Sequence, residues 1–395
     1  MELKTIKKMD DAYFMRVFGE RLPVCFDHGE ACYLYDTDGK KYTDFLCGIA
    51  VCALGYSDEG YKAALTDQVN KLLHTSNYFY IAPQAKLARL LCESTGYDKV
   101  FFSNSGSEAV EGAMKLARKY FHEQGQHKYE IITMKDSFHG RTLATLAATG
   151  QEKFHAPFQP LTPSFKYVPY NDIDAVQNAV SKDTCAVMLE PVIGEGGIIP
   201  AKTDYYKAIR RLCDEHGILM IADEIQTGMG RTGKLLCSMH YGVKPDITVL
   251  AKSLGNGVPI GAFLAKERIA QTFRPGDHGS TFGGNHLATA AALYMTKKVT
   301  SPGFLDRIQK TGAYFKAKLT ALAKRKPAIT EVRGMGLMLG MALNPDINAK
   351  DILKKLLQEG FVTAAAGNNT IRFLPPYVIQ KLDIDALVDA LKRIL

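Results

Sequence analysis

Short, continuously apolar segments alternate with helical patterns along most of this 395-residue chain. Apolar runs such as 130–134, 185–190 and 217–224 are predicted strands, and stretches with helical spacing such as 108–121 and 205–217 lie between them. Strands that are apolar on both faces and separated by helices build a parallel sheet covered on both sides. The chain is therefore predicted to be an α/β protein with a large, mostly parallel sheet.

The pattern changes toward both ends of the chain. Residues 31–45 predict a hairpin with a turn at Asp38-Gly39, and strand and helix patterns resume after a long helical stretch at about 286–325. We predict an N-terminal segment (1–54) that packs with the small domain, a large cofactor-binding α/β domain (55–290) and a C-terminal small α+β domain (291–395).

Composition excludes several classes of protein. The mean hydropathy is −0.10 and no apolar run approaches the roughly 18 residues of a spanning helix, so no membrane span is expected. The net charge of +8 is scattered, with no basic run interleaved with aromatics, which disfavours nucleic acid and suits small anionic substrates. The eight cysteines lack CxxC or zinc spacing, which predicts reduced, buried thiols and no metal. Without a secretory signal at its start, the chain is expected to be cytoplasmic.

Two predicted strands end in residues of opposite charge. In open α/β sheets ligands bind at the carboxyl ends of the strands, which is where Asp223 and Lys252 fall. A poorly solvated carboxylate needs a partner, and a desolvated lysine has the depressed pKa of a nucleophilic amine. An ordinary ion pair between neighbouring strands is the alternative, and these two residues alone do not exclude it.

Small and polar loops follow other strands. Ser105-Gly106-Ser107 precedes a helix and forms either an anion site or a simple serine N-cap. Phe138 and Arg141 place an aromatic ring and a guanidinium in one turn, and a second hydroxyl-bearing loop contains Ser280 and Thr281. A glycine-rich stretch adds two acidic residues, Glu190 and Glu195.

The segment 228–233 matches GxGxxG, and with Lys234 it nearly matches a phosphate-binding loop. Leu235, however, stands where a serine or threonine would coordinate magnesium, so a nucleotide-binding regulator is the weaker hypothesis. A binding protein that keeps the fold without activity is a third reading, and the presence of both Lys252 and Asp223 argues against it.

Pyridoxal 5′-phosphate requires this set of groups: a lysine for its Schiff base, a carboxylate for its ring nitrogen, a helix N-terminus for its phosphate and an aromatic ring to stack on. The motifs also resemble, in order and over essentially the whole chain, those of the class III aminotransferases of fold type I. The matching segments are Ser105–Ala109, Phe138–Thr142, Glu190-Pro191, Asp223–Gly228 followed by Lys252, and Gly279–Gly284.

The resemblance implies a role for each residue. Lys252 holds the cofactor as an aldimine and moves the proton, while Asp223 keeps the ring nitrogen protonated. Gln226 contacts the ring 3-oxygen and Phe138 stacks on the ring. The phosphate is held by Ser105, Gly106, Ser107 and by Thr281 of a partner subunit, which implies a homodimer.

Softer motifs, among them Asp44–Val51, Asn77–Tyr80 and Ile371–Pro376, resemble the branch of the family that acts on N2-acetylornithine. That branch transfers the δ-amino group to 2-oxoglutarate, giving N-acetylglutamate 5-semialdehyde and glutamate in arginine biosynthesis. Arg141 would bind the donor carboxylate and Arg372 the second carboxylate of the acceptor, with Glu195 as a switch and Ser280 also at the substrate. Sibling ω-aminotransferases acting on ornithine, N-succinylornithine, N-succinyl-diaminopimelate, N-acetyl-lysine-type donors or 4-aminobutyrate remain the alternative.

Overall fold

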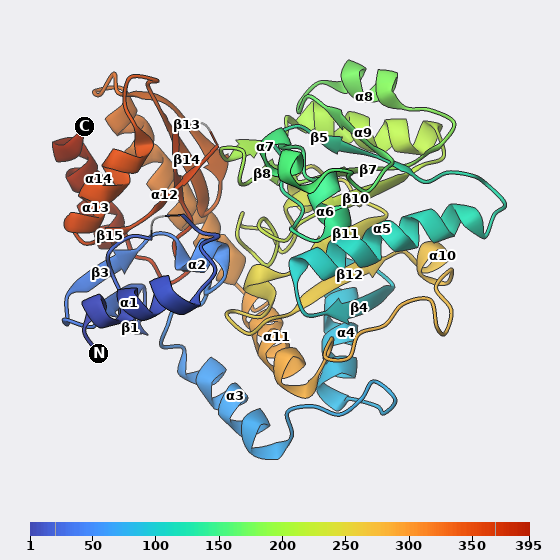
Figure 1. Ribbon diagram of the computed structural model, residues 1–395, viewed down its shortest axis with the longest axis horizontal. Coiled ribbons are helices and arrows are strands. Elements are labelled where there is room, and N and C mark those ends of the chain that lie inside the picture. Colours follow the sequence, from blue (N-terminus) through green and yellow to red (C-terminus); the bar gives the residue numbers. More distant parts are fainter. Residues whose placement is uncertain (20, 368) are drawn as a thin grey trace.

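A computed structural model describes residues 1–19, 21–367 and 369–395. Its largest sheet has seven strands (Figure 1). Their order is β4 (Lys99–Ser103), β12 (Gly261–Ala265), β11 (Ile247–Leu250), β10 (Leu219–Asp223), β7 (Thr184–Leu189), β5 (Glu130–Met134) and β6 (Phe165–Val168). β12 runs antiparallel to both its neighbours, whereas the β11–β10–β7–β5–β6 pairs are parallel. The carboxyl ends of all strands except β12 therefore meet at one edge.

Helices cover both faces of this sheet. α5 (Gly106–His122) packs Ala113 and Leu116 with Ile221 of β10, whereas α9 (Thr203–Glu215) packs Ile209 with Met220 of the same strand. Successive residues of a strand point to opposite faces, so these two helices lie on opposite sides. This explains why the strands are apolar throughout.

Two smaller sheets lie beside the large one, at the left of Figure 1. The first joins β1 (Phe26–Glu30), β2 (Tyr33–Asp36) and β3 (Lys41–Asp44) to β15 (Phe361–Val362), so the N-terminal segment shares a sheet with the C-terminal part. The second has the order β13 (Ile329–Met335), β14 (Met338–Leu343), β17 (Thr370–Phe373) and β16 (Ala364–Ala366). The helices there are α12 (Phe304–Ala323), α13 (Ala349–Gln358) and α14 (Lys381–Ile394).

The remaining elements complete the layers. They are α1 (Leu3–Tyr13), α2 (Cys47–Ala50), α3 (Glu59–Lys71), α4 (Ala82–Thr95), α6 (Leu143–Ala148), α7 (Glu152–His155), α8 (Ile173–Ala179), α10 (Glu267–Ala270), α11 (His286–Val299), the β8 (Val192–Ile193) and β9 (Ile199–Pro200) pair, and short 3-10 turns at Ala156–Phe158, Cys237–His240 and Lys252–Leu254. Within the described residues, every helix is too short or too polar to span a bilayer.

The predicted α/β class, the mostly parallel sheet and the 31–45 hairpin are confirmed. The helical stretch expected at about 286–325 is confirmed, but it is divided into α11, which ends at Val299, and α12, which starts after Gly303, whose φ of 77° is left-handed. The antiparallel strand β12 was not anticipated. The boundaries at residues 54 and 290 stay a prediction.

A buried carboxylate anchors the start of β11, the strand that leads to Lys252. Asp246 accepts hydrogen bonds from Arg210 Nη1 at 2.7 Å, Lys266 Nζ at 2.8 Å and Arg268 Nη2 at 2.9 Å. Burial acts to raise the pKa of Asp246, but these cations and the Met220 N–H outweigh it and lower the pKa below its usual value. The charged Asp246 therefore stabilises the folded protein at pH values above the ordinary aspartate pKa. This stabilisation is lost as the pH falls through the depressed pKa of Asp246.

We predict that Asp246→Asn lowers the free energy of unfolding by about 3 kcal/mol at pH 7, because it removes a buried carboxylate charge that the cations of Arg210, Lys266 and Arg268 share. The deficit should begin to shrink as the pH falls below the ordinary aspartate pKa of about 4, and it should close once the pH is below the depressed pKa, where the wild-type carboxylate is protonated in the folded protein too. Urea unfolding across pH measures both effects. Asp385→Asn, which breaks an exposed pair with Lys318, is the control and should leave the midpoint nearly unchanged. Equal midpoints for Asp246→Asn and wild type would contradict this account.

Candidate active site

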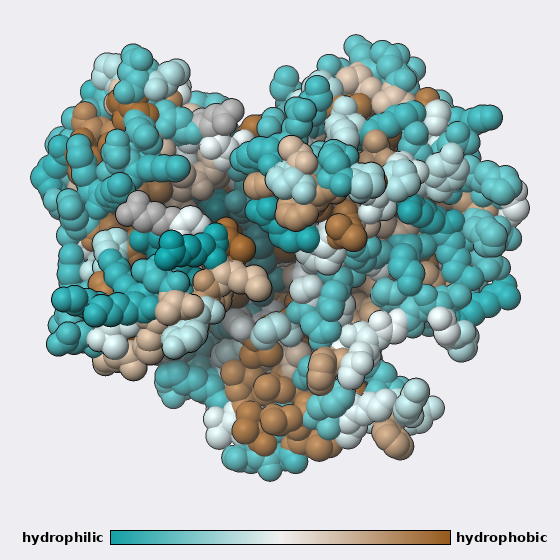
Figure 2. All heavy atoms as spheres, in the orientation of Figure 1, coloured by the Kyte–Doolittle hydropathy of each residue, from teal (hydrophilic) through white to brown (hydrophobic). Residues whose placement is uncertain are grey.

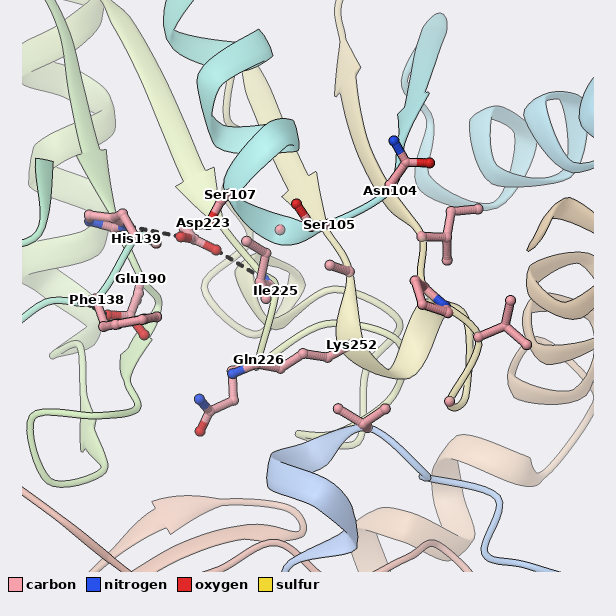
Figure 3. Close-up of a pocket in the computed structure, with 18 residues that line it drawn as sticks. Asn104, Ser105, Ser107, Phe138, His139, Glu190, Asp223, Ile225, Gln226 and Lys252 are labelled. Carbon is pink, nitrogen blue, oxygen red and sulfur yellow. Dashed lines mark hydrogen bonds and ion pairs between the residues drawn. The ribbon is translucent and has the colours of Figure 1, made fainter. Parts of the chain in front are cut away.

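A cavity of about 360 Å³ opens at the carboxyl edge of the large sheet. Its volume lies within the range of small-molecule sites. The predicted residues that line it are Ser105, Gly106, Ser107, Phe138, Asp223, Gln226 and Lys252, together with Glu190 and His139 (Figure 3). They follow β4, β5, β7, β10 and β11, so the topology brings these strand ends together.

Lys252 follows β11 at a backbone φ of 44°, an uncommon conformation for a residue with a side chain. Burial lowers the pKa of its amine, partly opposed by the Glu195 carboxylate. Among the described residues its Nζ makes no hydrogen bond or ion pair, so the ordinary Asp–Lys pair considered as an alternative is absent. The site therefore holds a desolvated, unpaired amine, as a nucleophilic lysine requires.

Asp223 ends β10 and is paired with a histidine instead. His139 Nδ1 lies 2.8 Å from Asp223 Oδ2, and the Ile225 N–H donates to Oδ1 at 3.1 Å (Figure 3). Both side chains are almost fully buried. Sequence reasoning assigned no role to His139. The signal was available, because a buried carboxylate requires a partner and His139 lies in the loop after β5, whose carboxyl end is at the same edge of the sheet.

The N-terminus of α5 forms the cradle proposed for a phosphate. Ser105 Oγ accepts the Glu108 N–H at 3.2 Å, so the serine is an N-cap, while earlier first-turn N–H groups have no partner within the helix. A Cβ on Gly106 would lie 2.7 Å from Ile225 Cδ1, and one on Gly140 would lie 2.3 Å from Ser107 Oγ. The backbone here is packed too closely for larger residues, as at an anion site.

Glu190 joins two loops of the site. Its Oε1 accepts the Phe138 N–H at 3.0 Å and its Oε2 accepts the Gly194 N–H at 3.0 Å. Burial raises the pKa of Glu190 to about 7. The residue thus fixes both the aromatic ring and the loop that carries Glu195.

Arg372 and Glu195 form a partly buried ion pair that Gln226 also contacts. Arg372 Nη1 donates to Glu195 Oε1, and Gln226 Nε2 donates to the same oxygen at 3.3 Å. Burial acts to raise the pKa of Glu195, but Arg372 and Lys252 outweigh it, so the pKa is lowered and the carboxylate stays charged. The structure therefore brings the predicted switch residues into contact with a residue that lines the cavity.

Other predicted residues lie outside the cavity of the single chain. Arg141 is exposed beside Gly140, and Thr281 is exposed on the surface. Ser280 Oγ accepts hydrogen bonds from Asn104 Nδ2 at 3.1 Å and from the Gly283 N–H at 2.9 Å, so it shapes its own loop. Within one chain, therefore, neither Ser280 lies at the predicted substrate site nor Thr281 at the predicted phosphate site.

The GxGxxG segment has a structural role. Arg231 is fully buried and donates to the carbonyls of Pro375 at 2.5 Å and Leu337 at 3.2 Å. The Leu337 N–H returns a bond to the Arg231 carbonyl. The loop joins the large sheet region to the C-terminal one, which accounts for a motif that resembled a phosphate loop.

The arrangement fits pyridoxal phosphate. It supplies an amine without a partner, a carboxylate held by a histidine, a helix N-terminus and a half-buried phenylalanine around one cavity. The Nε2 atom of the buried His139 has no hydrogen-bond partner among the described residues. With Nδ1 paired to Asp223, this second ring nitrogen is an unsatisfied polar atom beside the site.

Comparisons with known proteins agree with this chemistry. Residues 15–395 match the family model described as aminotransferase class-III. The chain is 49% identical over 387 residues to the acetylornithine aminotransferase of Methanocaldococcus jannaschii, covering 98% of this chain and 96% of the relative.

Two solved structures are also similar. The acetylornithine aminotransferase from Elizabethkingia anophelis has 33% identity and a TM-score of 0.89, covering 100% of this chain and 99% of the other. An ornithine aminotransferase from Toxoplasma gondii, described with partial occupancy of PLP at its active site, has 32% identity and a TM-score of 0.95, covering 100% and 94%.

Proposed function

The chain belongs to the class III aminotransferases, and we propose that it transfers the δ-amino group of N2-acetylornithine to 2-oxoglutarate. The products are N-acetylglutamate 5-semialdehyde and glutamate, a step of arginine biosynthesis. Relatives at 42–49% identity that carry the acetylornithine aminotransferase name support this reaction. The structural neighbours include ornithine aminotransferases, so ornithine is the main competing donor.

The observation that carries the proposal is the difference between the two arginines. Arg141 has no carboxylate partner within the described residues, whereas Arg372 is neutralised by Glu195. The donor has one carboxylate, which matches the free guanidinium of Arg141. Its other, acetylated end is neutral and matches Arg372, whose charge is neutralised by Glu195. The acceptor has two carboxylates, and it fits once Glu195 leaves Arg372.

Family members use pyridoxal phosphate, and the residues around the cavity fit it. We assign the phosphate to Ser105, Gly106 and Ser107, the ring face to Phe138 and the ring 3-oxygen to Gln226. When bound, the cofactor supplies an electron sink for the negative charge that develops at the carbon losing its proton.

The protein's own groups then move and hold protons. Lys252 Nζ, with its lowered pKa, would hold the cofactor and would carry the proton that the donor δ-carbon loses. Asp223, held by His139, supplies the negative charge that keeps the ring nitrogen protonated.

The switch can be tested with Glu195→Gln, which removes the charge but keeps the size. Arg372 is then unpaired, so we expect the KM for 2-oxoglutarate to fall and the KM for N2-acetylornithine to rise by about tenfold. Pre-steady-state measurement of each half-reaction separates the two effects. If both half-reactions matched the wild type, Glu195 would not be a switch.

We further propose a homodimer in which the partner's Thr281 completes the phosphate site. Exposed apolar side chains gather near α3 and the loops that follow it, on the lower edge of Figure 2; they include Val69, Leu72, Leu73, Phe79 and Phe282. A patch of this kind marks an interface. Sedimentation should give twice the mass of the chain, and Thr281→Ala should weaken cofactor binding by about tenfold. A monomer that binds the cofactor fully would contradict this proposal.

The donor is tested by comparing kcat/KM for N2-acetylornithine, ornithine, N-succinylornithine, N-succinyl-diaminopimelate and 4-aminobutyrate, each with saturating 2-oxoglutarate. The proposal predicts the highest value for N2-acetylornithine. A higher value for another amine would move the function to a sibling reaction. The cytoplasmic location inferred from the sequence stays a prediction.

A further inference from the structure

Arg141 is held in an unusual way for an arginine that binds a carboxylate. Within the described residues its guanidinium makes no ion pair and no side-chain hydrogen bond, and only its backbone N–H bonds, to Ser107 Oγ at 3.3 Å. Its Cζ instead lies 4.0 Å from the ring centroid of Phe154 and 5.3 Å from that of Phe138. Two aromatic rings are the groups that restrain this exposed side chain.

The Phe154 ring is itself fixed. It is half-buried in α7 and meets Phe138 edge-on, with centroids 6.5 Å apart and planes at 81°. The flanking His155 bonds to the Leu146 and Thr149 carbonyls at 3.0 and 2.6 Å, which ties α7 to α6. The ring is therefore a rigid support that connects the cofactor-facing Phe138 to Arg141.

We propose that Phe154 is a positioning residue that orients Arg141 for the α-carboxylate of the donor; this inference rests on the proposed function. A cation held over an aromatic ring keeps its N–H groups free for a bidentate carboxylate, whereas a carboxylate partner on the protein would compete with the substrate. Lys153 Nζ lies 4.9 Å from the same centroid and adds to the positive field that attracts the anion.

If Phe154 orients Arg141, loss of the Phe154 ring should lower kcat/KM only for a donor that carries the α-carboxylate. For Phe154→Leu holoenzyme, kcat/KM for N2-acetylornithine should fall by about tenfold, through KM, with kcat nearly unchanged. N-acetyl-1,4-diaminobutane, which lacks the α-carboxylate but keeps the reacting amine, should be used by Phe154→Leu and wild type at rates within about twofold of each other. Phe154→Tyr, which keeps a ring, should retain wild-type values.

Two further variants make the test specific. Phe165, in β6, has a ring that lies near another arginine, Arg118 of α5. Phe165→Leu removes this ring and should leave the ratio of kcat/KM between the two donors unchanged. In an Arg141→Met background, Phe154→Leu should have no additional effect on that ratio, because the group it orients is gone.

Equal losses with both donors, a lowered kcat, or failure of Phe154→Tyr to restore activity would each overturn the inference. These outcomes are separable from failure of the proposed function. If wild-type enzyme does not use N2-acetylornithine, the substrate assignment is wrong. If wild type does use it but Phe154→Leu keeps the wild-type donor ratio, only the role of Phe154 is wrong.

Discussion

Lys252→Ala is expected to lower kcat by at least about 10⁴-fold, the largest effect of any substitution considered. Its Nζ is the amine without a protein partner among the residues lining the cavity, and burial lowers its pKa below the usual lysine value. Its removal takes away both the amine that we propose holds the cofactor and the group that we propose carries the proton. Single-turnover kinetics with N2-acetylornithine measures the loss.

The control for Lys252→Ala is Lys234→Ala. Lys234 is exposed in the loop that resembled a phosphate site, so its removal should leave kcat unchanged. Far-UV circular dichroism should show that both variants are folded. Wild-type turnover in Lys252→Ala would contradict the assignment of the catalytic amine.

Asp223→Asn is expected to lower kcat by roughly 10²- to 10³-fold, as removal of a preorganised charge at a developing charge does. The amide keeps the shape of the side chain but loses the charge that keeps the ring nitrogen protonated. The variant should still bind the cofactor, because the phosphate cradle at Ser105–Ser107 is untouched. Loss of kcat with retained binding is therefore the diagnostic pattern.

The matched control is Asp136→Asn, an exposed carboxylate in the loop after β5, which should retain kcat. If Asp223→Asn kept kcat within about threefold of wild type, the ring nitrogen would not depend on this charge.

The residues that end strands were predictable from the sequence. A continuous apolar run ends at Asp223 and another just before Lys252, and a parallel sheet brings such ends to one edge. Local patterns were therefore sufficient for the fold class and for the centre of the site. The strand β12 was missed because its sequence, GAFLA, consists largely of glycine and alanine, which are uncommon in strands.

Contacts between distant side chains were not predictable in the same way. The His139–Asp223 pair joins residues 84 positions apart, and the Arg141–Phe154 contact depends on how α7 folds back on the loop after β5. Periodicity carries no information about such pairings. The GxGxxG segment misled for a related reason, since Gly228 packs closely against Leu250 and Gly233 against Gln309 instead of a phosphate.

We propose that one site serves two substrates in turn, a monocarboxylate donor and a dicarboxylate acceptor. The most direct test is to add N2-acetylornithine alone to the holoenzyme and follow the visible absorbance of the bound cofactor. The account predicts that this absorbance is lost in a single turnover, and that 2-oxoglutarate then restores it with release of one glutamate per site. Absorbance that is unchanged by N2-acetylornithine but lost with ornithine or 4-aminobutyrate would contradict it.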